Sequence, residues 1–275
     1  MSDHSVKGLF LDLDGTFLND AKQLPEENRK ALNDMLAQGH KAIITTGRPL
    51  PSAILQAEHL GLSGPGCYLI AYNGGVLYDT GERNIIFERT IPLNIVREIF
   101  DEANRRNVHI QAYDRKAVLV EPRCDNDAVR FYCRRIEMEW GVVPSVSELT
   151  EEPAKLLMID RGSREPLEAM KEWVISTYPG VIDSFFSSKE LLEVMPAGLS
   201  KGDGLMRLAK LIGMDIADTV AIGDEENDIS MIRAAGIGVA MKNAIAAAKE
   251  AADYITEQDN NHGGAAEAIR RFILN

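Results

Sequence analysis

Two aspartates separated by one residue follow an apolar run near the start of the chain, within residues 12–16, DLDGT. The run from Val6 to Leu13 predicts a buried strand. Side chains two residues apart in a strand point the same way, so we expect Asp12 and Asp14 to face one side at its carboxyl end. Ligands bind at that end in open α/β sheets. Two carboxylates so close repel unless a cation lies between them or one stays protonated, and oxygen ligands of this type suit Mg²⁺.

A second polar segment, residues 45–48 with the sequence TTGR, ends another β-rich run that begins at Lys41. A hydroxyl and a free backbone N–H at this position could hold phosphate oxygens beside the start of a helix. A strand-end turn with a helix cap explains the segment better when it is taken alone.

A third segment, residues 200–202 with the sequence SKG, predicts a helix start with Ser200 as the N-cap and Lys201 in the first turn. A lysine is misplaced there, because the helix dipole prefers an anion at this end. A phosphate held between the lysine and the helix would remove the conflict, and a solvated lysine fits the pattern equally well.

A fourth segment, residues 223–228 with the sequence GDEEND, follows the apolar run from Thr219 to Ile222 and opens a helix. Asp224 and Asp228 can bind a divalent cation, and Asn227 can form a hydrogen bond to a ligand or a carboxylate. An acidic helix N-terminus, favourable by itself, is the alternative.

The four segments together resemble the haloacid dehalogenase (HAD) superfamily of phosphatases, in its Cof-type branch with a C2B-like cap. DLDGT, TTGR, SKG and GDEEND stand in the family's order over the whole length, with a gap of cap size between the second and the third. The resemblance implies that Asp12 is the nucleophile and that Asp14 is the general acid/base. It implies a Mg²⁺ ion held by Asp12, Asp224 and the backbone carbonyl of Asp14, with Asp228 orienting Lys201 or a metal-bound water.

The same resemblance implies a set of phosphate-binding residues drawn from the second, third and fourth segments: Thr46, Gly47, Lys201 and Asn227. Thr45 and Thr46 both offer a hydroxyl, and Thr46 is preferred because it directly precedes Gly47. The chemistry is consistent with these roles, since phosphoryl transfer needs an in-line nucleophile and neutralisation of the phosphate charge.

The elements that would position these residues form two patterns. Strands and helices alternate up to about residue 71 and again from about residue 200, which predicts an α/β fold with a doubly wound, Rossmann-like parallel sheet. Between them, hairpins and helices are mixed, including a helix expected from Asn126 to Trp140. We therefore predict a catalytic core of residues 1–82 and 193–275, with residues 83–192 inserted as an α+β cap that gives substrate specificity.

Composition narrows the function further. The formal net charge is −12 and the pI is about 5.0, which argues against nucleic-acid binding and means that phosphate chemistry needs a local cation. Three cysteines without metal-binding spacing favour a reduced, cytoplasmic compartment. The N-terminus lacks a signal-peptide layout, and no apolar run approaches the ~18 residues of a membrane span. The oligomeric state stays open.

These observations predict a magnesium-dependent phosphatase that hydrolyses phosphate monoesters of small metabolites through an aspartyl phosphate on Asp12. Sugar phosphates are the usual range of the family that the chain resembles. Two alternatives remain: a phosphomutase of the same superfamily, and a non-catalytic protein that binds a phosphorylated ligand. The intact acids and lysine argue against the second, because such like-charge groups are costly to keep together without a function.

Overall fold

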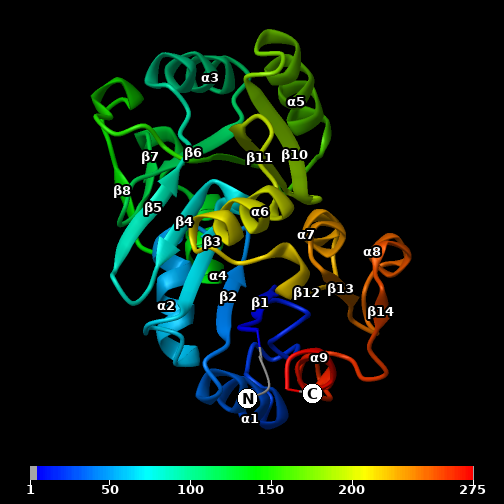
Figure 1. Cartoon of the computed structure of the whole chain (residues 1–275). Coiled ribbons are helices and arrows are strands. Elements are labelled where there is room, and N and C mark those ends of the chain that lie inside the picture. Colours follow the sequence, from blue (N-terminus) through cyan, green and yellow to red (C-terminus); the bar gives the residue numbers. More distant parts are fainter. Residues whose placement is uncertain (1–4, 275) are drawn as a thin grey trace. The chain divides into compact units, whose positions relative to one another are not determined.

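The computed structural model describes residues 5–274 (Figure 1), so residues 1–4 and 275 of the predicted core lie outside the described part. The chain divides into two compact units. The first comprises Met1–Gly47, Ala53–Phe87 and Ser200–Asn275, and the second comprises Arg48–Ser52 and Glu88–Leu199. Each unit has its own sheet.

The first unit is built on an eight-stranded sheet in the order β14-β13-β12-β1-β2-β3-β4-β5. The strands from β14 to β3 are parallel, and β4 is antiparallel to β3. Their bounds are β1 Gly8–Leu11, β2 Lys41–Thr45, β3 Cys67–Ala71, β4 Val76–Asp79, β5 Asn84–Glu88, β12 Thr219–Gly223, β13 Ile237–Ala240 and β14 Tyr254–Ile255.

Helices connect these strands, as the alternating sequence pattern predicted. They are α1 Glu26–Ala37, α2 Leu50–Leu60, α6 Lys201–Leu211, α7 Ile229–Ala234, α8 Ala246–Ala251 and α9 Gly264–Phe272. All four residues of β1 are buried, as expected for a parallel strand covered on both faces. On one face, Phe10 of β1 and Ile43 of β2 pack in one cluster with Leu205 and Leu208 of α6.

The second unit is an α+β module with a six-stranded, mainly antiparallel sheet in the order β10-β11-β9-β6-β7-β8. Its strands are β6 His109–Tyr113, β7 Val118–Val120, β8 Trp140–Val142, β9 Leu156–Ile159, β10 Ile182–Ser188 and β11 Leu191–Pro196. Its helices are α3 Leu93–Arg105, α4 Asp127–Ile136 and α5 Glu165–Thr177. α3 and α5 supply apolar side chains to one core with β6, β9 and β11. The predicted fold class, a parallel α/β core with an inserted α+β unit, is confirmed.

The chain passes from the first unit to the second after Phe87 and returns at Ser200, whereas the sequence predicted an insertion of residues 83–192. Strand β5, which begins at Asn84, neighbours β4 in the first sheet. Leu192 lies within β11, which pairs with β9 and β10 in the second sheet. Sheet pairing, which a local sequence pattern does not reveal, therefore moves both divisions later in the chain.

The helix expected from Asn126 to Trp140 is shorter than predicted. Asn126 is its N-cap, as its side chain accepts from the backbone N–H of Ala128 at 2.9 Å. The helix ends at Ile136 because Glu137 adopts a left-handed conformation, with φ 56°. Trp140 instead begins β8, which pairs with β7 in parallel.

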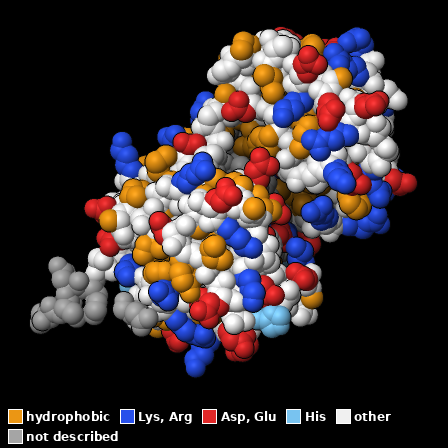
Figure 2. All heavy atoms as spheres, turned by 90° about the vertical axis from the view of Figure 1, so that its right-hand side faces the viewer, with side chains coloured by type: hydrophobic (Ala, Val, Ile, Leu, Met, Phe, Trp, Pro, Cys, Tyr) orange, Lys and Arg blue, Asp and Glu red, His pale blue; other side chains and the backbone are white. Residues whose placement is uncertain are grey.

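The described part of the chain contains no helix that is both long and apolar enough to cross a membrane. On the molecular face in Figure 2, Lys and Arg side chains occur together with Asp and Glu side chains.

Candidate functional site

The first and fourth segments meet at the carboxyl ends of neighbouring strands in the first unit. Asp12 directly follows β1, and its backbone N–H donates to the carbonyl of Ile222 in β12 at 3.1 Å. Asp224 directly follows β12. Because β1 and β12 are adjacent and parallel, both aspartates leave the same edge of the sheet.

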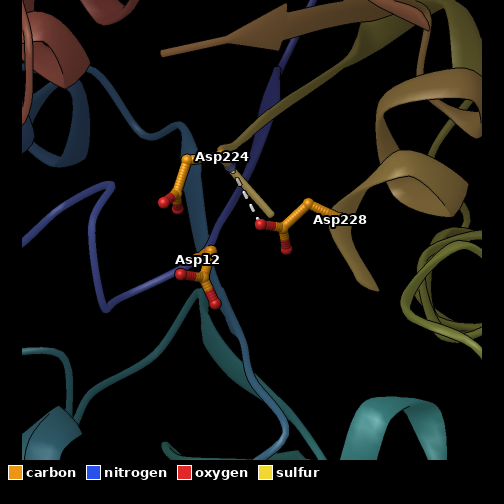
Figure 3. Close-up of side chains that lie close together, drawn as sticks. All are labelled: Asp12, Asp224 and Asp228. Carbon is orange, nitrogen blue, oxygen red and sulfur yellow. Dashed lines mark hydrogen bonds between the residues drawn. The ribbon is translucent and has the colours of Figure 1, made fainter. Parts of the chain in front are cut away.

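Three carboxylates form a buried cluster at this edge (Figure 3). One oxygen from each of Asp12, Asp224 and Asp228 lies within 4.8 Å of the others. Asp228 reaches the cluster from the turn after β12, where its Oδ2 accepts the backbone N–H groups of Asp224 at 2.9 Å and Glu225 at 3.0 Å. Glycine at position 223 allows this approach, because a Cβ there would lie 2.4 Å from the Cβ of Asp228.

Lys201 is buried beside this cluster, with 1% of its surface exposed. Its Nζ donates to Oδ1 of Asp12 and to Oδ1 of Asp228, at 2.6 Å each. Burial lowers the pKa of Lys201, but the two carboxylates outweigh burial and raise it. The alternative of a solvated lysine is therefore wrong. The conflict with the helix dipole is offset by two anions, and Ser200 caps the helix as predicted, accepting from the N–H of Asp203 at 3.1 Å.

The electrostatics of the cluster favour an additional cation. Burial raises the pKa of Asp12 to about 8, despite the attraction of Lys201, and the nearby carboxylates of Asp228 and Asp224 add to the increase. Burial also raises the pKa of Asp224 to about 6, against a hydrogen bond from Thr16. One lysine thus does not compensate three buried carboxylates, and a divalent cation would favour their ionised forms.

The hydrogen bonds distinguish the three carboxylates as possible metal ligands. Both oxygens of Asp228 accept hydrogen bonds, from Lys201 and from two backbone N–H groups. Within residues 5–274, hydrogen bonds to the other two carboxylates involve only Oδ1, from Lys201 to Asp12 and from Thr16 to Asp224. The remaining Oδ2 atoms of Asp12 and Asp224 are hard oxygen donors of the type that Mg²⁺ binds, so the residues present fit this ion.

Asp14 is not placed by strand alternation, contrary to the expectation from the sequence. β1 ends at Leu11, and Asp14 lies in the following turn, where Gly15 has φ +85°. The carboxylate of Asp14 pairs with Nζ of Lys22 at 2.7 Å and is 39% exposed. The chain thus leaves the sheet directly after Asp12, so the side-chain alternation of a strand does not apply to the pair.

Thr16 has a role that the sequence did not suggest. A bond from its hydroxyl to the local backbone would be usual after such a turn, but the hydroxyl donates to Oδ1 of Asp224 at 2.7 Å. Gly15 permits this contact between distant segments, because a Cβ there would lie 2.3 Å from Oδ2 of Asp224. The signal in the sequence was the Gly-Thr pair itself, but its partner is 208 residues away.

The second segment lies next to Asn73, which follows β3. Thr46 and Gly47 follow β2, and the carbonyl of Thr46 accepts the N–H of Asn73 at 3.0 Å. Asn73 has a left-handed φ of 49°, and its Oδ1 accepts from Nδ2 of Asn227 at 3.1 Å. Asn73 therefore connects the second segment with the fourth. The candidate phosphate-binding residues Thr46, Gly47, Lys201 and Asn227 all belong to the first unit.

A family model described as haloacid dehalogenase-like hydrolase matches residues 9–269. The match covers nearly the whole chain, so this protein belongs to the haloacid dehalogenase-like hydrolases. Its predicted identity as a HAD-type phosphatase, a hydrolase, is confirmed at the level of the family.

Relatives and solved structures agree with this assignment. The 5-amino-6-(5-phospho-D-ribitylamino)uracil phosphatase YcsE of Bacillus subtilis is 30% identical, with 99% of this chain and 98% of YcsE covered. The crystal structure of a haloacid dehalogenase-like hydrolase from Bacteroides thetaiotaomicron has a TM-score of 0.90 and 32% identity, covering 97% of this chain and 99% of that one. A sugar phosphatase of HAD subclass IIB has a TM-score of 0.78 and 25% identity, covering 97% and 99%.

Proposed function

We propose that this protein is a magnesium-dependent phosphatase that hydrolyses phosphate monoesters of small sugar-like metabolites through an aspartyl phosphate on Asp12. The observation that carries the proposal is the buried ion pair of Lys201 with Asp12, at 2.6 Å, beside the carboxylates of Asp224 and Asp228. A carboxylate nucleophile needs compensating positive charge to approach a phosphate dianion, and this arrangement supplies one cation and ligands for a second.

In the first step, one oxygen of the Asp12 carboxylate bonds to phosphorus as the ester O–P bond breaks. Asp14 gives a proton to the leaving oxygen of the metabolite. In the second step, Asp14 takes a proton from a water molecule whose oxygen bonds to phosphorus as the bond between Asp12 and phosphorus breaks. This step releases inorganic phosphate and restores the carboxylate of Asp12. For these steps the carboxyl group of Asp14 turns from Lys22 towards the reacting oxygen, which its position in an exposed turn permits.

The Mg²⁺ ion would be held by the carboxylates of Asp12 and Asp224 and by the backbone carbonyl of Asp14. When bound, it supplies charge neutralisation for the nucleophile and the phosphoryl oxygens. Asp228 keeps Lys201 charged and oriented, because its Oδ1 accepts from the ammonium while its Oδ2 is fixed by two backbone N–H groups. Thr46, Gly47, Lys201 and Asn227 would bind the remaining phosphate oxygens.

For the substrate we propose a small phosphorylated sugar or sugar alcohol. The name of YcsE specifies a phosphorylated ribityl compound, and the subclass IIB enzyme is named a sugar phosphatase. Both names thus describe polyhydroxylated metabolites. We propose that the second unit supplies substrate specificity, as an inserted cap. The three cysteines are buried and unpaired, which supports a reducing, cytoplasmic location.

The test is phosphate release from a panel of sugar, sugar-alcohol, nucleotide and pyridoxal phosphates, with Mg²⁺ or with EDTA. The proteins compared are the native chain, Asp12→Asn and the control Asp34→Asn, which changes an exposed residue of α1. We expect metal-dependent release by the native chain and the control, highest with sugar-like substrates, and none by Asp12→Asn. Release by Asp12→Asn at the native rate would contradict the proposed nucleophile. Conversion of one sugar phosphate into another without phosphate release would indicate a mutase.

A further inference from the structure

Thr45, the last residue of β2, carries a buried hydroxyl that has no hydrogen-bond partner. Its exposed surface is 0%, and its Oγ1 is one of two buried side-chain polar atoms without a partner in the described part of the chain. A buried hydroxyl without a partner costs free energy, because folding has removed the water that it would otherwise bond. Such a group therefore calls for a partner in another state of the protein.

The sheet register places Thr45 beside the nucleophile. Leu11 of β1 pairs with Ile44 of β2, so the next residues, Asp12 and Thr45, lie opposite each other. Neighbours in register point to the same face of a parallel sheet. Two residues earlier on each strand, Phe10 and Ile43 share the apolar cluster under α6. Thr45 and Asp12 therefore point to the face on which α6 begins with Lys201.

The other neighbour of Thr45 in the sheet is apolar. Thr45 pairs in register with Ile70 of β3, which belongs to the same buried cluster. The hydroxyl thus has a hydrocarbon side chain on one side and the ionic pair of Asp12 with Lys201 on the other. Of these two neighbours, only the ionic side offers a hydrogen-bond acceptor.

In the resting state the hydroxyl of Thr45 donates to neither carboxylate oxygen of Asp12. Oδ1 of Asp12 already accepts the ammonium of Lys201 at 2.6 Å. Under the proposed function, the charge of Lys201 is needed on the phosphoryl oxygens once Asp12 carries the phosphoryl group. The ammonium of Lys201 then donates less to the carboxyl group of Asp12. The hydroxyl of Thr45 is the neighbouring donor on the same face.

We propose that Thr45 is a positioning residue whose hydroxyl donates to the carboxyl group of Asp12 when Asp12 carries a phosphoryl group. The hydroxyl is unpaired at rest and paired in the phosphorylated enzyme, so it stabilises the intermediate relative to the resting enzyme. Because the bond forms while the phosphoryl group is transferred, it also stabilises the transition state of that step, so its loss lowers kcat rather than substrate affinity. This inference rests on the proposed function and adds a residue outside the set that the family resemblance implies.

The test compares Thr45→Val, which keeps the shape and removes the hydroxyl, with Thr45→Ser, which keeps the hydroxyl. The control is Thr219→Val at the start of β12, where the buried hydroxyl is already paired with the carbonyl of Ile216 at 2.7 Å. Thermal unfolding is measured for each protein with Mg²⁺ alone and with Mg²⁺ and beryllium fluoride, a mimic of a phosphoryl group on aspartate. Steady-state phosphate release is measured in parallel.

We expect Thr45→Val to be at least as stable as the native chain with Mg²⁺ alone, and to show a smaller stabilisation by beryllium fluoride. Its kcat should fall by about 2- to 10-fold with little change in KM, the range for losing one hydrogen bond between neutral groups. Thr45→Ser should retain native behaviour. Thr219→Val should lose stability equally in both conditions and keep its kcat.

Equal stabilisation of Thr45→Val and the native chain by beryllium fluoride, with equal kcat, would overturn the role of Thr45. A loss of stability in Thr45→Val that is the same with and without beryllium fluoride would also overturn it, by showing a purely structural residue. A native chain that neither releases phosphate nor responds to beryllium fluoride would instead refute the proposed function, so the two failures are distinguishable.

Discussion

Asp12→Asn in the metal-free protein tests whether burial keeps a proton on the carboxyl group of Asp12. Burial raises the pKa of Asp12 from 3.8 to about 8. An acid with a higher pKa in the folded state binds its proton more tightly when folded. The native chain should therefore lose stability as pH rises from about 4 to about 8, and the loss should be complete above pH 8. Asparagine stays neutral, keeps the shape and can still accept from Lys201, so the variant should not show this loss.

The size of the effect follows from the same values. Each unit of pKa difference corresponds to about 1.4 kcal/mol, so the three units between pH 5 and pH 8 correspond to at most about 4 kcal/mol. The two proteins should have similar stability at pH 5. At pH 8 in EDTA, Asp12→Asn should be the more stable by up to about 4 kcal/mol. Saturating Mg²⁺ should reduce this difference, because the ion favours the ionised carboxylate of the native chain.

The measurement is urea unfolding followed by far-ultraviolet circular dichroism. Tryptophan fluorescence would not report on this site, because both tryptophans of the chain lie in the second unit. Asp34→Asn serves as the control and should follow the native chain at every pH. A stability difference between Asp12→Asn and the native chain that does not change between pH 5 and pH 8 would show that Asp12 has no raised pKa.

Three further changes test other parts of the structure. Asp228→Asn removes one of two carboxylates that hold the buried lysine of the third segment. It should lower the free energy of unfolding by roughly 1–3 kcal/mol in a circular dichroism assay, because Lys201 keeps Asp12 as its other partner. Native stability of that variant would contradict the assigned ion pair. Lys155→Met removes the buried ammonium that lies 3.3 Å from the carboxylate of Glu193 and should lower the free energy of unfolding by roughly 3–5 kcal/mol, read by tryptophan fluorescence in the second unit. An unchanged urea midpoint would show that Glu193 finds another compensation. Lys22→Met removes an exposed partner that the carboxyl group of Asp14 must leave during the proposed reaction, and should speed turnover of an alkyl phosphate by at most about fivefold. Turnover of p-nitrophenyl phosphate, which needs little acid catalysis, should not change, and equal changes on both substrates would argue against this link to Asp14.

Much of the site could be predicted from the sequence because each chemical group follows a strong local signal. Apolar runs followed by acids predicted the strand ends that carry Asp12 and Asp224, and Ser200 identified the start of α6. The parallel order of the strands then brings distant segments to one edge. The predicted α/β class followed from the same alternation of strands and helices.

The remaining features depend on contacts between distant segments. The bond from Thr16 to Asp224 spans 208 residues, and the bond from Asn227 to Asn73 spans 154 residues. The sequence could not show whether Lys201 is buried or solvated, because the segments that cover the start of α6 are distant in the chain. The apolar run did not predict where the first strand ends: β1 stops at Leu11, and Asp14 lies in the turn that contains Gly15.

Direct detection of a phosphoryl group on Asp12 would test the proposed covalent mechanism. Asp14→Asn lacks both the acid of the first step and the base of the second. A substrate that needs little acid catalysis should therefore still form the aspartyl phosphate, which the variant then hydrolyses slowly. The variant is mixed with Mg²⁺ and p-nitrophenyl phosphate, quenched in acid, digested and analysed by mass spectrometry. We predict one added phosphoryl group on the peptide that contains Asp12, and none when Asp12 is also changed to Asn. Phosphate release by the native chain, with no phosphoryl group on that peptide and full activity in Asp12→Asn, would contradict this mechanism.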